Sequence, residues 1–337
     1  MQSFTYLPWM AVLLAPGRWL LGDVRWALMA ITVLGALALR GYTPRVAART
    51  VPAPQDAPDD TGQDRTAPGR TEPAGLAGAA PGTGAAGEVT GGAGDLPPTR
   101  ATVPTRGSAA AGALLLLLPG TATVVEQAWT EPVLLACIAG ASLAWRGRRP
   151  WLAALLLALG MASKQHLALL VPLLLLWPRF GVRRTLAVGT GAGLLLLPWF
   201  LADPAAMWHD TVTFLVHFPP LVFSDTLFIA ALRELAWTPP FWLTGAIVLG
   251  TVGTAAWTIR RRNPDLGTLL RWAALVLFVA SLVNKQAFYN QFWLVGALLL
   301  ASWAVPADAE TPDGDGPDRS DPTEVSQEVP RQAGAAA

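Results

Sequence analysis

Two short polar sequences within apolar stretches contain residue types that can bind an anion. Only two of the 24 Lys and Arg residues are lysines, and each lies between a small polar residue and a glutamine, in Ser163-Lys164-Gln165 and Asn284-Lys285-Gln286. A lysine in hydrocarbon is costly unless it pairs or faces water, and its ammonium binds phosphate as a point charge. We predict that both sites bind a lipid phosphate through the lysines and neighbouring neutral donors: Lys164, Gln165, His166, Lys285, Gln286 and Asn290.

The alternative is that both lysines snorkel to the outer membrane interface and act as anchors. Under the phosphate interpretation neither lysine has an evident partner within the chain. We therefore expect replacement of either one by Met to preserve the fold, because a desolvated charge is removed.

Two carboxylates are the candidate general bases. Glu126 and Glu131 flank Trp129 between two apolar stretches, so we expect them to face an outer cavity. The other acidic residues outside the polar segments of the chain are typical of solvated interfacial loops. Glu126 and Glu131 are therefore the catalytic candidates that the residues themselves suggest.

The sequence offers little for a metal ion or a cofactor. His209, Asp210 and His217 could together bind a divalent ion, but histidines beside aromatic residues are also common at membrane interfaces. The single cysteine, Cys137, lies in an apolar run and excludes Cys-rich zinc sites. No phosphate-binding loop, dinucleotide fingerprint or nucleophile elbow is present. We predict no metal, no cofactor and no nucleic-acid partner.

Apolar helices must position these residues. The 337 residues are 53% hydrophobic and 14% charged, whereas soluble domains are about 25% charged. Residues 44–107, rich in Pro, Gly and Ala, and the acidic residues 306–337 contain no aromatic residue. The remainder predicts an all-α, polytopic integral membrane protein with about eight to ten membrane helices, some of them short or re-entrant.

The same composition divides the chain into four parts. Segments 44–107 and 306–337 bury too little apolar surface to offset chain entropy, so we predict a disordered linker and a disordered cytoplasmic tail. We expect the linker to be dispensable for folding. N-terminal membrane segments occupy 1–43, and the main membrane domain occupies 108–305.

The arginines predict an orientation in the membrane. Clusters at 146–149, 179–184 and 260–262 favour the cytoplasmic side, which places Glu126–Glu131 and the loop 203–237 outside. The 29 residues between the first two clusters would need two crossings to return to the same side. We therefore predict two short helices that meet at Ser163–His166, within the thickness of the bilayer.

Five segments resemble, in order, the polytopic glycosyltransferases of the GT-C superfamily, and most of all the mannosyltransferase-like members of glycosyltransferase family 87 of the actinobacterial type. The resemblance covers residues 4–304 apart from the linker. Its individual motifs are short and degenerate, so the resemblance rests on their order and spacing. The segments are FTYLPWMAVLLAP, GDVRWAL, VEQAWTEPVLL, LGMASKQHLALLVPLLL and NKQAFYNQFWLV.

The resemblance implies a hexosyltransferase in the plasma membrane. Such an enzyme transfers a hexose from a polyprenyl-phosphate sugar donor to a glycan or lipid acceptor at the extracytoplasmic face, with inversion. It also implies a catalytic Asp in a loop ahead of a Tyr-x-Pro sequence. Tyr6-Leu7-Pro8 stands at the start of this chain, so we expect the catalytic loop to be missing here.

Two other classes of function are compatible with the same residues. A transporter or lipid flippase would bind an anionic substrate at the two Lys-Gln sites near the middle of the membrane. The long aromatic outer loop and the lack of an obvious inverted repeat argue against this. A catalytically inactive scaffold is the third possibility.

Overall fold

A computed structural model describes residues 7–42 and 106–305, and every regular element in those two ranges is helical. The predicted all-α class is confirmed for this part of the chain. The predicted linker and tail lie outside the described residues, except for Arg106 and Gly107, with which α3 begins. The elements are α1 (Pro8–Leu21), α2 (Val24–Arg40), α3 (Arg106–Leu117), α4 (Thr121–Glu126), α5 (Glu131–Arg146), α6 (Pro150–Ser163), η1 (Gln165–Leu170), α7 (Val171–Leu176), α8 (Val182–Ala202), α9 (Pro204–Trp208), η2 (His209–Thr213), α10 (Phe214–His217), α11 (Leu227–Glu234), α12 (Phe241–Arg262), α13 (Leu266–Leu282) and α14 (Tyr289–Ala304).

Short polar residues and glycine set several helix boundaries. The Asp23 carboxylate accepts from the Arg25 backbone N–H at the start of α2, and Asp265 accepts from Thr268 in the same way at α13. Gly22 ends α1 at φ 78°, a left-handed conformation that glycine adopts without steric cost. The acidic caps therefore have a structural role at helix starts.

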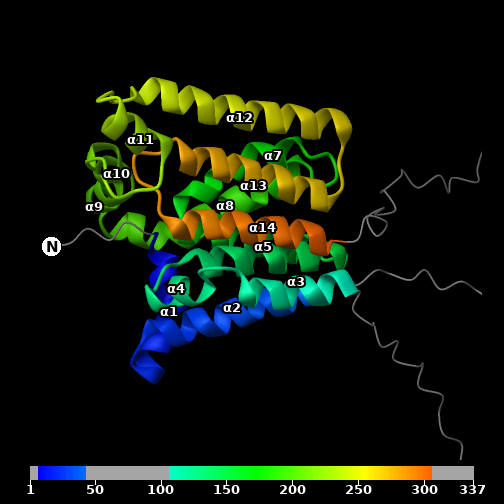
Figure 1. Ribbon diagram of the computed structural model, residues 1–337. Helices are drawn as coiled ribbons and strands as arrows, with labels where there is room; N and C mark the ends of the chain where they lie inside the picture. The colour runs from blue at the N-terminus through cyan, green and yellow to red at the C-terminus, as the bar shows by residue number, and fades with distance from the viewer. Residues whose placement is uncertain (1–6, 43–105, 306–337) are drawn as a thin grey trace, which may run out of the picture. The chain divides into compact units, whose positions relative to one another are not determined.

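The helices pack both against neighbours in sequence and against helices farther along the chain (Figure 1). α5 contacts α6 and α2, α6 contacts α8, and α13 contacts α14. Small residues permit close approach at the crossings. A Cβ added at Gly112 on α3 would lie 2.7 Å from the Ala36 carbonyl oxygen on α2, and one at Gly267 on α13 would lie 3.0 Å from the Ser302 carbonyl oxygen on α14.

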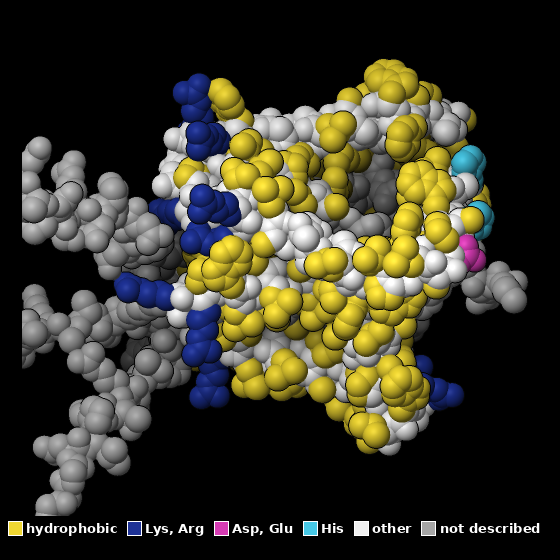
Figure 2. Space-filling model, turned by 180° about the vertical axis from the view of Figure 1, so that it is seen from behind, with side chains coloured by type: hydrophobic (Ala, Val, Ile, Leu, Met, Phe, Trp, Pro, Cys, Tyr) yellow, Lys and Arg dark blue, Asp and Glu magenta, His cyan; other side chains and the backbone are white. Residues whose placement is uncertain are grey.

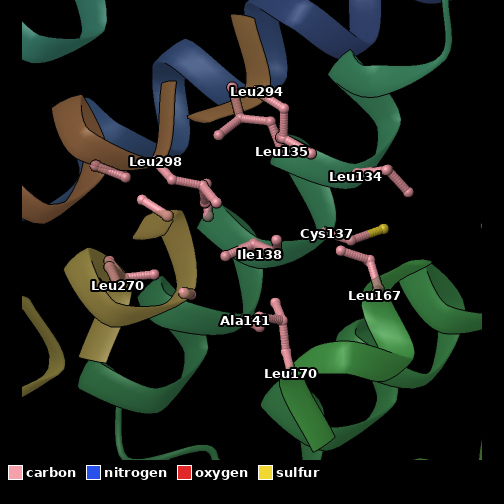
Figure 3. Close-up of a cluster of buried hydrophobic side chains, with 14 of the residues drawn as sticks. Leu134, Leu135, Cys137, Ile138, Ala141, Leu167, Leu170, Leu270, Leu294 and Leu298 are labelled. Atoms are coloured by element: carbon pink, nitrogen blue, oxygen red, sulfur yellow. The ribbon is translucent and has the colours of Figure 1, made fainter. Parts of the chain in front are cut away.

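The apolar core is centred on α5. Figure 3 shows its side chains meeting residues of η1, α13 and α14. Ile138 of α5 is 5% exposed and lies among these neighbours. Elements that adjoin both predicted Lys-Gln sites therefore contribute to the core around α5. The labelled members of the cluster are Leu134, Leu135, Cys137, Ile138, Ala141, Leu167, Leu170, Leu270, Leu294 and Leu298.

The three arginine-rich turns lie at one end of the helices. The Arg184 guanidinium lies 5.6 Å from the centre of the Trp145 ring, which joins the start of α8 to the end of α5. Arg179 donates to the Asn263 carbonyl oxygen at 3.4 Å, which joins the α7–α8 turn to the end of α12. Figure 2 shows Lys and Arg side chains gathered at this end. This grouping agrees with the sidedness that the arginines predict.

The break predicted at Ser163–His166 is present, because α6 ends at Ser163 and η1 begins at Gln165. Fewer of the described helices are long and apolar enough to cross a membrane than the eight to ten membrane segments predicted. Among the described helices, α8 and α12 are long and apolar enough to span a membrane, and α1 with α2, bent by 119°, form a third candidate. Shorter apolar helices of 10–17 residues account for other predicted segments, including α3, α6, η1 with α7, and α13.

Candidate functional site

A buried ion pair joins α5 to the break between α6 and η1. The Lys164 ammonium donates to the Glu131 carboxylate through a direct hydrogen bond. Glu131 is fully buried, and Lys164 is 8% exposed. Because two charges taken out of water are tolerated only as a pair, each side chain depends on the other. Lys164 therefore does not snorkel to an interface.

Asn290, the second residue of α14, belongs to the same buried cluster. Its amide faces the Glu131 carboxylate, and it is 4% exposed. Oε2 of Glu131 and Oδ1 of Asn290 have no hydrogen-bond partner among the described residues. The cluster thus joins three segments that are far apart in sequence: the start of α5, the end of α6 and the start of α14.

A cavity of about 720 Å³ lies beside this cluster. His166, Lys285 and Gln286 contribute polar groups to its wall, and α12 and α13 contribute apolar side chains such as Val248 and Leu277. Figure 2 shows a hollow beneath α12, bordered by hydrophobic side chains, at the end that carries the histidines. The cavity therefore combines a polar region with apolar walls. Further polar residues in its lining are Thr244, Ser281, Asn284 and Gln291.

Lys285 lies at the turn between α13 and α14, where the segment 203–237 contacts it. Its ammonium donates to the Val216 carbonyl oxygen at 2.7 Å. The Leu221 N–H donates to the Lys285 carbonyl oxygen at 3.4 Å, and the Asp225 N–H donates to the Ala287 carbonyl oxygen at 3.2 Å. Desolvation lowers the pKa of Lys285 from its ordinary value. The loop residues Leu215 and Val216 also line the cavity, so this loop forms part of the site.

The predicted phosphate-binding residues therefore fall into two groups. His166, Lys285 and Gln286 line the cavity, whereas Lys164 and Asn290 belong to the buried cluster behind it. Gln165 is half-buried and lies between Lys164 and His166 in the chain. The two lysines do not line a common pocket.

The two carboxylates predicted as general bases also differ. Glu126 is exposed at the end of α4, and Glu131 is buried against Lys164. Neither residue lines the cavity. Their catalytic role therefore stays a prediction, and neither carboxylate is positioned to act on a ligand in this cavity.

His209 and His217 each contact a nearby polar group of the chain. His209 Nδ1 contacts Asp210 Oδ1 at 2.9 Å, and His217 Nδ1 contacts the Thr213 carbonyl oxygen at 2.9 Å. The described ranges contain no group of three or more His, Cys, Asp or Glu side chains that could hold a metal ion.

Some residues of the site were not anticipated from the sequence. The Ser281 hydroxyl donates to Gln291 Oε1 at 3.0 Å, and both residues line the cavity with Val216. Gln291 directly follows Asn290, which the sequence analysis had assigned to the second Lys-Gln site. Its position in the sequence could therefore have identified it as a residue of the site. Val216 acts through its backbone carbonyl, which no sequence pattern reveals.

Comparisons of the chain with models of protein families, with curated proteins and with solved structures find no match.

Proposed function

We propose that the chain is a multi-pass plasma-membrane protein that binds a polyprenyl-phosphate sugar in the cavity and transfers its hexose to a glycan or lipid acceptor. The observation that carries the proposal is the meeting of His166 with Lys285 and Gln286 in one cavity, although they lie more than a hundred residues apart in the chain. The resemblance to the GT-C glycosyltransferases supplies the class of reaction.

The composition of the cavity favours an amphiphilic ligand. An ammonium, an imidazole and an amide are donors for phosphate oxygens. The wall formed by Val248, Leu249 and Leu277 offers no hydrogen bond from its side chains and suits a hydrocarbon chain. A free sugar or a small soluble anion would leave this apolar wall without a partner.

The proposed reaction uses these donors on the leaving group. The acceptor hydroxyl oxygen attacks the anomeric carbon and releases its proton to water, the bond from that carbon to the phosphate oxygen breaks, and polyprenyl phosphate leaves with the bonding electrons. Negative charge accumulates on the phosphate, where Lys285, Gln286 and His166 would offset it. Because neither Glu126 nor Glu131 lines the cavity, the proposal assigns no general base to either residue.

The separation of the two lysines bears on the transporter alternative. That alternative requires an anion to be shared between two equivalent Lys-Gln sites. Lys164 is instead paired with Glu131, and Lys285 alone lines the cavity. A single polar region that the outer loop partly covers fits an enzyme that acts from the outer side better than a symmetric carrier.

A turnover assay tests the proposal. Membranes containing the protein are incubated with a polyprenyl-phosphate hexose, and release of polyprenyl phosphate is measured against membranes that contain the Lys285→Met variant. The proposal expects release by the wild type and a large reduction in the variant. Movement of the intact donor across the bilayer without loss of its hexose would favour the flippase alternative.

A further inference from the structure

The break between α6 and η1 falls in a run of residues that contains no helix breaker. From Met161 to Leu170 the chain contains neither Gly nor Pro, and Ala, Leu, Lys and Gln are good helix formers. No side chain caps the start of η1. Nevertheless Lys164 is extended, with φ −156° and ψ 125°. A tertiary contact must therefore hold the chain out of the helix at this residue.

The ion pair with Glu131 is a tertiary contact at that residue. Glu131 is the first residue of α5 and fully buried, so its carboxylate occupies a fixed position. If α6 continued as a helix, the Lys164 side chain would point in another direction and leave Glu131 without its counter-ion. Such an unpaired buried charge is strongly unfavourable. The pair therefore selects the broken conformation over the continuous helix.

This break determines where His166 points. An α-helix has 3.6 residues per turn, so each residue sets the direction of those that follow it. A change in the backbone at Lys164 therefore rotates the following side chains about the helix axis. His166 lies two residues after Lys164, lines the cavity and is close enough to both charges to interact with them. In the buried cluster, Asn290 faces Glu131 and directly precedes the cavity residue Gln291.

We propose that Glu131 and Lys164 are positioning residues: their buried ion pair holds the α6–η1 break, and with Asn290 it fixes the cavity walls that carry His166 and Gln291. Lys164 then acts on a ligand through His166 instead of binding it directly. A buried ion pair contributes little net stability compared with well-packed apolar residues, but it can select one arrangement of the chain. The proposed role concerns the geometry of the cavity and rests on the proposed function only where ligand binding is measured.

The test compares cysteine reactivity in two backgrounds, after replacement of the single native cysteine by Cys137→Ala. His166→Cys is combined either with the native pair or with the neutral double substitution Glu131→Gln/Lys164→Met. Because the double substitution leaves no buried charge, cooperative thermal unfolding in detergent should be retained. We expect maleimide labelling at position 166 to slow by at least about tenfold in the double variant, because that residue turns out of the cavity.

Thr244→Cys provides the matched control. Thr244 lines the same cavity from α12 but has no link to the ion pair, so its labelling should change by less than about twofold between the two backgrounds. Equal labelling at position 166 in both folded backgrounds would overturn the positioning role. If the double variant does not fold, Lys164→Arg is combined with His166→Cys in its place. Because this substitution retains the positive charge, the labelling rate at position 166 should stay the same. A tenfold lower rate would overturn the proposal.

A binding measurement separates this inference from the proposed function. Polyprenyl phosphate is titrated into the double variant and the wild type, each with its native histidine. Weaker binding by the folded double variant supports both ideas, and equal binding contradicts the positioning role. If the wild type does not bind polyprenyl phosphate but labelling at position 166 still depends on the pair, the proposed function fails and the positioning role stands.

Discussion

Lys164 and Glu131 are 33 residues apart in sequence and form a direct hydrogen-bonded ion pair inside the helical bundle. The pair lies behind the wall of the cavity instead of within it. This relationship gives the two Lys-Gln sequences different roles. Lys164 is buried against an acid, whereas Lys285 lines the cavity and donates to the Val216 carbonyl oxygen.

Removing Lys164 alone should destabilise the protein strongly. Lys164→Met leaves the fully buried Glu131 carboxylate without its counter-ion, which costs about 3–5 kcal/mol. Denaturant unfolding of the detergent-solubilised protein measures this loss. Lys285→Met is the matched comparison, because Lys285 is only half-buried and its bond to Val216 is to a backbone carbonyl. It should cost less than about 1.5 kcal/mol. Similar losses for the two variants would contradict the difference between the lysines.

That prediction corrects an expectation from the sequence. Replacement of either lysine by Met was expected to preserve the fold, because neither had an evident partner. The structure supplies a partner for each: Glu131 for Lys164, and the Val216 carbonyl oxygen for Lys285. Loss of Lys164 would leave a buried charge unpaired, whereas loss of Lys285 would leave only a backbone carbonyl oxygen without its donor. We therefore expect replacement by Met to preserve the fold for Lys285 but not for Lys164.

A methyl group at Gly112 should loosen the contact between α2 and α3. The added Cβ would lie 2.7 Å from the Ala36 carbonyl oxygen, so the helices must move apart, at a cost of about 1–3 kcal/mol. Thermal unfolding of Gly112→Ala in detergent tests this expectation. Gly250→Ala is the control, because nothing lies within 4 Å of its added Cβ in α12. The control should be neutral or stabilising by up to about 1 kcal/mol. A fully stable Gly112→Ala protein would count against the close crossing.

The two ends of the helices should lie on opposite sides of the membrane. In whole cells, an impermeant maleimide should label Asp210→Cys in the outer loop but not Arg262→Cys at the arginine-rich end. Each substitution is made in a Cys137→Ala background. Both positions should be labelled after lysis. Labelling of position 262 before lysis, with position 210 protected, would reverse the topology.

The sequence predicted features that depend on local composition. N-terminal membrane segments are predicted within 1–43, and the structure has two apolar helices there, α1 at Pro8–Leu21 and α2 at Val24–Arg40. The arginines predicted that the turns after α5, α7 and α12 share one end, and contacts such as Arg184 with Trp145 agree with it. The polar sequence Ser163–His166 also marked the break after α6, because polar side chains inside an apolar stretch need a protein or water environment.

The pairing of the candidate residues could not be predicted in the same way. Glu131 was singled out as a possible base facing an outer cavity, and Lys164 as a phosphate ligand, whereas they neutralise each other. Which acid meets which lysine depends on how α5 packs against α6, and neither periodicity nor spacing reports that packing. The contribution of Val216 was also invisible, because a backbone carbonyl carries no signature in the side-chain sequence.

The central claim is that Lys285 binds the phosphate of a lipid ligand in the cavity. Titration of the detergent-solubilised wild type and Lys285→Met proteins with polyprenyl phosphate tests it most directly. Arg233→Met is the matched control, because Arg233 is an exposed cation on α11 that does not line the cavity. We expect Lys285→Met to weaken binding by about 1.5–3 kcal/mol, or roughly 10- to 150-fold, and Arg233→Met to leave it unchanged. Equal affinities of the wild type and the Lys285→Met protein would contradict the claim.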